Sequence, residues 1–153
     1  MIQDWGEFKV GNKVTTMSRT LTDGDFAAII NATWEFGPLH TDAEHMKNTQ
    51  FGKRMLGGPS LIGIISGISG NALYSMWNRD GLDCVAGLGI DHVRYLAPFH
   101  PGDTLTDEIE VLELQNTRKK PGRYVGRIKD KAFKQDGQTV LEMERIYLLV
   151  PLG

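Results

Sequence analysis

The chain contains a long internal segment, residues 55–78, in which no side chain carries a charge. About half of its residues are Gly, Ser, Asn or Pro, so it lacks the continuous apolar run of a membrane-spanning helix. Its apolar residues surround the helix instead of forming one stripe, which is typical of a helix buried on most sides. Pro59 favours a start at the beginning of this segment, because proline fits the first turn of a helix. The sequence therefore predicts a long buried helix and no membrane partner.

Three glycines recur along this predicted helix, at Gly63, Gly67 and Gly70. A glycine in a helix interior costs roughly 1 kcal/mol relative to alanine. We expect close packing to offset that cost, with a sheet approaching the narrow glycine face of the helix.

After Asp80-Gly81 the apolar pattern changes to a period of two, which indicates half-buried strands. The expected strands lie near residues 84–96, 103–115, 123–135 and 138–150. Asp136-Gly137 predicts a tight hairpin turn, and residues 119–122 predict a loop. With an earlier strand at residues 13–21, the pattern predicts an α+β fold in which a curved, mainly antiparallel sheet wraps the long central helix. No internal repeat or linker divides the chain, so we expect a single domain over residues 1–153.

Two shorter helices are predicted before the central one. Thr22 and Asp25 form a capping box pattern, which predicts a helix from Thr22 to about Trp34. The Gly37-Pro38 pair should end it, because the residue before a proline is pushed out of the helical region. Asp42 can cap a further short helix, from residue 43 to about residue 49.

The composition limits the classes of partner and the compartment. The chain has 153 residues and a net charge of −2, which gives no general attraction for polyanions and makes nucleic acid an unexpected partner. A single cysteine, Cys84, excludes an internal disulfide and agrees with a reducing cytosol. The first residues contain an early acid and no apolar run, so no signal peptide is predicted and we expect a cytoplasmic protein.

The segment EFGPLHTD, residues 35–42, carries the residues most suited to chemistry. It puts the carboxylate of Glu35 five residues before the imidazole of His40, across a Gly-Pro bend. A carboxylate and an imidazole brought together can hold and activate a water molecule. The Gly57-Gly58 pair follows at the start of the long helix, where the backbone N–H of Gly58 can stabilise a developing oxyanion. These are the parts of an acyl-thioester hydratase.

Three separated segments, in the correct order, resemble the MaoC-like hydratases, the (R)-specific enoyl-CoA hydratases of the hotdog fold. Residues 35–42 are similar to the family motif Asp-x-Asn-Pro-(Leu/Ile)-His-x-Asp, and residues 57–58 to the end of its Ala-His-Gly segment. The third segment, RYLAPFHPGDTL at residues 94–105, is similar to the family's R-F-x-x-P-V-x-x-G-D element. The resemblance runs from about Thr22 to the C-terminus.

The resemblance implies a homodimer, or a higher homo-oligomer, acting on a trans-2-enoyl thioester of CoA or of an acyl-carrier protein. The product would be an (R)-3-hydroxyacyl thioester, and dehydration is the same reaction reversed. It implies catalytic roles for Glu35, His40 and the Gly58 N–H. It places Gly37 and Ser66 in the substrate pocket, with Asp42 as an alternative acid. Ser66 is equally well explained as a small residue of a close-packed helix face, and Asp42 as a helix cap.

The sequence departs from the family motif at three positions. Glu35 stands where the family has its catalytic aspartate, Gly37 where it usually has asparagine, and Gly57 where a histidine is common. Two other functions therefore stay open: a hotdog thioester hydrolase, and a non-catalytic protein that binds acyl thioesters. No pair of histidines has a metal-site spacing, and no nucleotide-binding loop is present, so we expect no metal and no cofactor.

Overall fold

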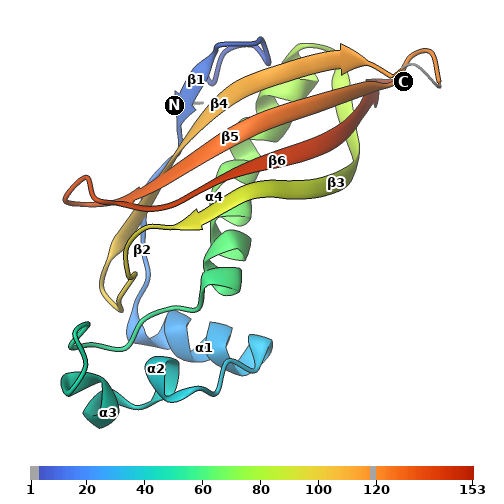
Figure 1. Cartoon of the computed structure of the whole chain (residues 1–153). Helices are drawn as coiled ribbons and strands as arrows, with labels where there is room; N and C mark the ends of the chain where they lie inside the picture. The colour runs from blue at the N-terminus through green and yellow to red at the C-terminus, as the bar shows by residue number, and fades with distance from the viewer. Residues whose placement is uncertain (1–3, 118–119) are drawn as a thin grey trace.

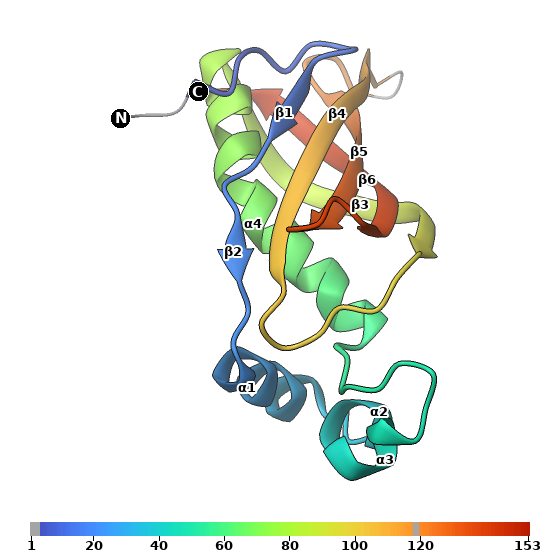
Figure 2. The same ribbon diagram turned by 90° about the vertical axis from the view of Figure 1, so that its left-hand side faces the viewer.

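The computed structural model describes residues 4–117 and 120–153. Its central feature is the long helix α4 (Gly58–Arg79), which runs beside the strands while they curve around it (Figures 1 and 2). Pro59 lies in its first turn, as the sequence predicts, and Gly57 is its N-cap residue. Among the described residues, no helix is long and apolar enough to cross a membrane.

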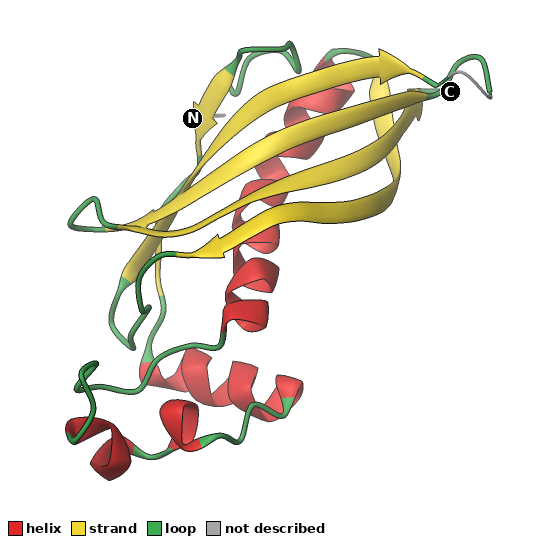
Figure 3. Ribbon diagram, viewed as in Figure 1, coloured by secondary structure: helices red, strands yellow, loops and turns green. Residues whose placement is uncertain are grey.

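One antiparallel sheet contains all the strands, in the order β1-β4-β5-β6-β3, with β2 also paired to β4 (Figure 3). The long strands are β3 (Leu82–Tyr95), β4 (Thr104–Asn116), β5 (Tyr124–Lys134) and β6 (Thr139–Pro151). Gly137, with φ of 83°, sits in the turn that joins β5 to β6. These strands and the hairpin confirm the predicted α+β architecture, whereas part of the predicted loop, Lys119, lies outside the described residues.

The strand predicted at residues 13–21 is wrong as a continuous element. It is divided into β1 (Lys13–Thr15) and β2 (Arg19–Thr20), both paired with β4. At the break, the Asp107 N–H donates to the side-chain hydroxyl of Thr16 over 3.0 Å, so a side chain takes the place of a backbone acceptor. That exchange interrupts the ladder.

Three short helices lie together beyond the N-terminal end of α4 (Figure 1). The first, α1 (Asp23–Thr33), has the predicted capping box between Thr22 and Asp25. The third, α3 (Ala43–Lys47), is capped by Asp42 as predicted. Between them α2 (Pro38–Thr41) is an unpredicted helical turn. The Gly37-Pro38 pair was expected to end α1, but α1 already ends at Thr33, where Trp34 adopts a left-handed conformation. The pair instead starts α2, because proline is favourable at the first helical position.

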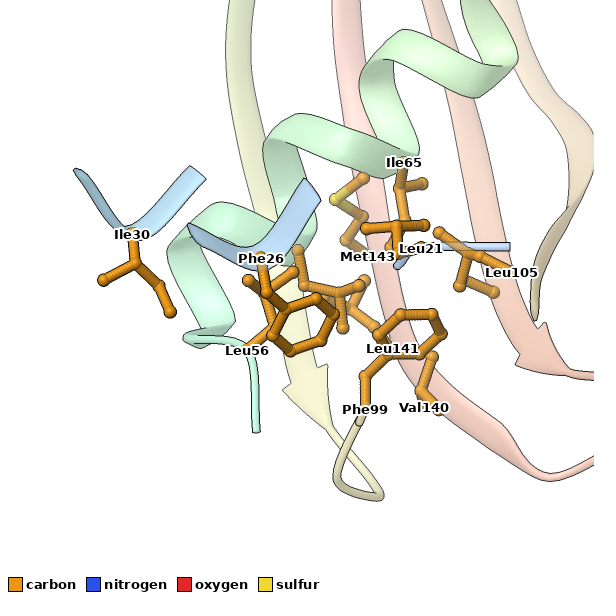
Figure 4. Close-up of a cluster of buried hydrophobic side chains, with 12 residues drawn as sticks. Leu21, Phe26, Ile30, Leu56, Ile65, Phe99, Leu105, Val140, Leu141 and Met143 are labelled. Atoms are coloured by element: carbon orange, nitrogen blue, oxygen red, sulfur yellow. The ribbon is translucent and has the colours of Figure 1, made fainter. Parts of the chain in front are cut away.

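A buried cluster joins the short helices to α4 and the sheet (Figure 4). Phe26 and Ile30 of α1 meet Leu56, Phe99 and Leu141 in this cluster, and the rings of Phe26 and Phe99 are stacked with centroids 6.3 Å apart. Phe26 is 0% exposed and Phe99 1%. The cluster fixes the helical layer on one end of α4, and it therefore positions the loops that carry the candidate catalytic side chains.

The expected role of the helix glycines is wrong. A Cβ atom added at Gly63, Gly67 or Gly70 would meet no atom within 4 Å, so the sheet does not approach this face. The buried face of α4 instead carries larger residues, among them Leu61, Ile65, Ser69, Ala72, Leu73 and Met76. Gly63 and Gly67 instead line a cavity between α4, α1 and residues 17–21, the segment that includes β2.

Candidate functional site

The segment 54–57, which leads into α4, is held by hydrogen bonds on both sides. The N–H of Met55 donates to the Leu39 carbonyl over 3.1 Å, and the N–H of Leu56 donates to the Phe99 carbonyl over 2.9 Å. Two histidine rings bind consecutive carbonyls of the same segment: His100 Nδ1 lies 2.8 Å from the Arg54 oxygen, and His40 Nδ1 lies 2.7 Å from the Met55 oxygen. This segment is therefore a fixed platform at the N-terminus of α4.

The contact to Met55 fixes the tautomer of His40. A carbonyl oxygen can only accept, so Nδ1 of the half-buried ring must carry the proton. In the neutral ring, Nε2 then has a free lone pair and can take a proton from a bound water or substrate. Helix α2 supplies the position, because the His40 N–H donates to the Gly37 carbonyl over 2.9 Å and starts this short helix.

Glu35 reaches the same platform from the end of α1. The chain reverses at Trp34, which has φ of 59° and whose N–H caps the helix by donating to the Ile30 carbonyl. A bulky residue in this left-handed region is uncommon and strained. The reversal places the Glu35 carboxylate directly against the backbone of Gly57, where a Cβ atom would overlap both carboxylate oxygens. Oε2 of Glu35 is buried and has no hydrogen-bond partner among the described residues, which is rare for a carboxylate oxygen and marks this acid as a candidate for a functional role.

The two side chains therefore approach one short stretch of backbone. His40 binds Met55, and the Glu35 carboxylate packs on Gly57. Because two residues of chain span at most about 7 Å, the acid and the imidazole lie in the same neighbourhood. A partly buried carboxylate beside a proton-accepting imidazole can activate water.

Gly58 is the first residue of α4, and its N–H has no hydrogen-bond partner among the residues of the described ranges. A free N–H at a helix N-terminus attracts negative charge. The ring of Tyr95 lies so close to Gly58 that any side chain there would collide with it. A cavity of about 330 Å³ adjoins this glycine and is also lined by Met55, Tyr95 and Phe99. Glu35 and His40 do not line this cavity, so it adjoins the acid–imidazole pair without containing it.

A sequence model of the MaoC like domain matches residues 7–131. The chain belongs to this family. Among relatives of this MaoC-like chain, the uncharacterised protein YdeM of Bacillus subtilis is 30% identical over 123 residues, which cover 76% of this chain and 78% of YdeM.

Solved structures agree with the family and with the hotdog fold. A monoamine oxidase regulatory protein from Archaeoglobus fulgius superposes with a TM-score of 0.82 at 31% identity, covering 95% of this chain and 92% of that one. The (R)-hydratase from A. caviae, involved in PHA biosynthesis, superposes with a TM-score of 0.70 at 26% identity, covering 95% and 97%.

The other predicted site residues of this MaoC-like chain have structural contacts as well. The Gly37 carbonyl accepts from the N–H groups of His40 and Thr41, in the first turn of α2. Asp42 is exposed, and its carboxylate caps α3 by accepting from the His45 N–H over 2.8 Å. The Ser66 hydroxyl donates to the Ile62 carbonyl over 2.9 Å, and its side chain lines a second cavity. Their roles toward a substrate stay predictions.

Two residues at the platform of this MaoC-like chain are not among the site residues predicted from the sequence. His100 is half-buried and binds the Arg54 carbonyl. Tyr95 reads as a strand residue, yet its ring covers Gly58. The only sequence signal for them is that both lie in the RYLAPFHPGDTL segment. Within the described ranges, no group of three His, Cys, Asp or Glu side chains is arranged to hold a metal ion.

Proposed function

We propose that the protein is a hydratase that adds water to a trans-2-enoyl thioester, with CoA as the expected carrier. The single observation that carries this proposal is the pairing at the platform, where His40 binds Met55 and Glu35 packs against Gly57. The MaoC-like family and the similarity to the A. caviae (R)-hydratase support the reaction class. By that similarity the product would be the (R)-3-hydroxyacyl thioester.

In this proposal Glu35 and His40 hold one water molecule. The Nε2 atom of His40 takes a proton as the water oxygen forms a bond to Cβ of the enoyl group. The π electrons move toward Cα and the thioester oxygen, where the free N–H of Gly58 stabilises the developing negative charge. The pair then returns a proton to Cα, so one water is added in total and no charge is left on the product.

A panel of enoyl-CoA substrates of increasing chain length tests this proposal. We expect the enoyl absorbance to fall with at least one of them, and chiral analysis of the product to find the (R)-3-hydroxyacyl thioester. Free thiol is measured in the same reactions. Release of thiol would indicate a hydrolase, and binding of the thioester without any turnover would indicate a binding protein.

A further inference from the structure

A second cavity, of about 370 Å³, lies between α4 and the end of the sheet formed by β3 and β6. Ser66 lines it from α4, Gly87 and Gly89 from β3, and Arg145 and Tyr147 from β6. The pairing of β3 with β6 is irregular between Gly87 and Gly89. Leu88 and Ile90 line it as well, and this whole stretch of β3 is exposed, so the cavity opens to the surface along the edge strand.

Arg145 is unusual among the lining residues, because it is a charged side chain with only 4% exposure. Its Nε binds one oxygen of Asp130 over 2.7 Å, and its Nη2 binds the other Asp130 oxygen over 2.5 Å and the Ser69 hydroxyl over 2.6 Å. Nε and Nη2 are therefore occupied, whereas Nη1 donates to none of the described residues. Since Arg145 lines the cavity, the N–H groups of Nη1 are the donors that it offers there.

Tyr147 offers a second polar group. Its hydroxyl has no hydrogen-bond partner in the described part of the chain, and Cζ of Arg145 lies 5.7 Å from the centre of its ring. Burial raises the pKa of Tyr147 to about 12, so the hydroxyl keeps its proton at neutral pH. The cavity therefore presents a guanidinium and a phenol, both able to donate to an oxygen atom.

The charges around the cavity balance without a ligand. The carboxylate of Asp130 neutralises Arg145. Burial, together with the nearby charge of Asp130, raises the pKa of Asp107 to about 10, so this second buried carboxyl is uncharged at neutral pH. An additional carboxylate would therefore find no unpaired positive charge at the cavity, because Asp130 already neutralises Arg145. A neutral oxygen that accepts hydrogen bonds needs no such charge.

The distance from Gly58 matches the length of an acyl chain. Ser66 lies eight residues after Gly58 on the same helix, which corresponds to about 12 Å along the axis. We propose that this cavity receives the far end of the acyl chain and recognises a neutral oxygen on it, a hydroxyl or a keto group, through Arg145 Nη1 and the Tyr147 hydroxyl. This inference rests on the proposed function, because it assumes that the thioester lies at Gly58.

The test compares matched substrates in the enoyl absorbance assay. Octenoyl-CoA and decenoyl-CoA are each paired with the same thioester carrying a hydroxyl on its last carbon. We expect kcat/KM to be higher for the hydroxylated partner of at least one pair, by on the order of tenfold, because a buried donor left unpaired costs about 1–3 kcal/mol. Equal kcat/KM values within both pairs would overturn the inference.

Tyr147→Phe removes one of the two donors. It should bring the ratio of kcat/KM for the hydroxylated substrate to kcat/KM for its unsubstituted partner closer to one. Tyr74→Phe is the matched control, because Tyr74 is an exposed tyrosine on α4 that does not line this cavity. Its preference should equal that of the unchanged protein. A Tyr147→Phe variant with an undiminished preference would contradict the assignment. Truncation of Arg145 is a poor test, because it leaves Asp130 buried without its partner and can prevent folding.

Two further outcomes separate this inference from the proposed function. A preference for octenedioyl-CoA, which ends in a carboxylate, would overturn the assignment of a neutral oxygen. If no enoyl thioester is hydrated, the proposed function fails, and calorimetry then compares octanoyl-CoA with its terminally hydroxylated form. Tighter binding of the hydroxylated thioester, weakened by Tyr147→Phe, would still support recognition of the oxygen, whereas equal binding would overturn it.

Discussion

His40 is the residue on which the proposed chemistry depends most directly. Its Nδ1–H is committed to the Met55 carbonyl, so the ring is oriented before any substrate binds. If Nε2 transfers a proton, His40→Ala should lower kcat for enoyl hydration by on the order of 10²–10⁴. His45→Ala is the control, since His45 is exposed on α3. Turnover of His40→Ala within a few-fold of the unchanged protein, with an unchanged thermal melt, would rule out this role.

Glu35 can be tested by changing its charge and its length separately. Glu35→Gln keeps the shape but cannot take a proton, and we expect it to abolish hydration. Glu35→Asp keeps the charge but withdraws it by about one C–C bond from Gly57, and catalytic groups need placement within about 0.5 Å. We therefore expect Glu35→Asp to weaken turnover. If turnover instead increased with Glu35→Asp, the pocket would still have the geometry of an aspartate. The natural glutamate would then be the reason for low activity.

For single residues, the sequence predicts which side chains belong to the candidate site better than it predicts which residues they contact. Glu35, His40 and Gly58 follow from a local motif, because they are close in sequence and the motif has a chemical meaning. The contact of His100 with Arg54 spans 46 positions, and the Arg145–Ser69 contact spans 76. Such pairs depend on how the sheet closes around α4, and no local pattern encodes that closure.

At the scale of the secondary-structure elements, glycines in two different environments at α4 can be tested separately. Gly63 has open space where a Cβ would lie, whereas a Cβ at Gly57 would strike the Glu35 carboxylate. Gly63→Ala should therefore raise the free energy of unfolding, by about 0.5–1 kcal/mol, because it removes the cost of a helical glycine. Gly57→Ala should displace Glu35 and lower kcat. Urea denaturation and the enoyl assay measure the two effects, and a destabilised Gly63→Ala would show that this helix face is covered.

The elements themselves follow from the sequence where the pattern is local. The capping box at Thr22, the cap at Asp42 and the alternating strands are confirmed because each depends on neighbours within a few residues. The split between β1 and β2 was not predicted, because it depends on a hydrogen bond between Thr16 and Asp107, 91 positions apart. The prediction that the sheet packs on the glycine face of α4 was wrong for a similar reason. The spacing of the glycines shows that they share one face of the helix, but it does not show which element packs against that face.

For the molecule as a whole, Asp107 predicts how stability changes with pH. Burial raises its pKa from 3.8 to about 10 in the folded protein, with Asp130 as the second cause. The folded state therefore holds a proton that the unfolded chain releases, so the free energy of unfolding should fall as pH rises between about 4 and about 10. The slope from this group is at most about 1.4 kcal/mol per pH unit.

Asp107→Asn should flatten that part of the pH profile, because the amide cannot titrate. Asp83→Asn changes an exposed aspartate of β3 and is the control, which should leave the profile unchanged. Urea denaturation from pH about 6 to about 9 measures both. An Asp107→Asn profile as steep as that of the unchanged protein would show that another group causes the dependence.

The free edge of β3 carries the prediction about assembly. Within the described part of the chain this strand ends the sheet and pairs with β6 alone, and it exposes Val85, Leu88 and Ile90. An exposed apolar edge strand usually needs a partner. We expect light scattering at micromolar concentration to give twice the protomer mass of 17.0 kDa. Ile90→Lys should shift the mass toward one protomer, whereas Val10→Lys, at an exposed valine outside the strands, should not. A clean monomer mass for the unchanged protein would contradict the proposed pairing.

The contact between Glu35 and Gly57 has an evolutionary consequence. The family motif that this sequence resembles pairs a shorter acid with a histidine at the position of Gly57, and here the longer acid occupies the space that any side chain at position 57 would need. The longer side chain at Glu35 and the missing side chain at Gly57 are therefore coupled, because the first fills the space that the second leaves empty. In an alignment of related sequences, glutamate at position 35 should occur together with glycine at position 57, and the lineage that acquired both should have lost the side chain at 57 first.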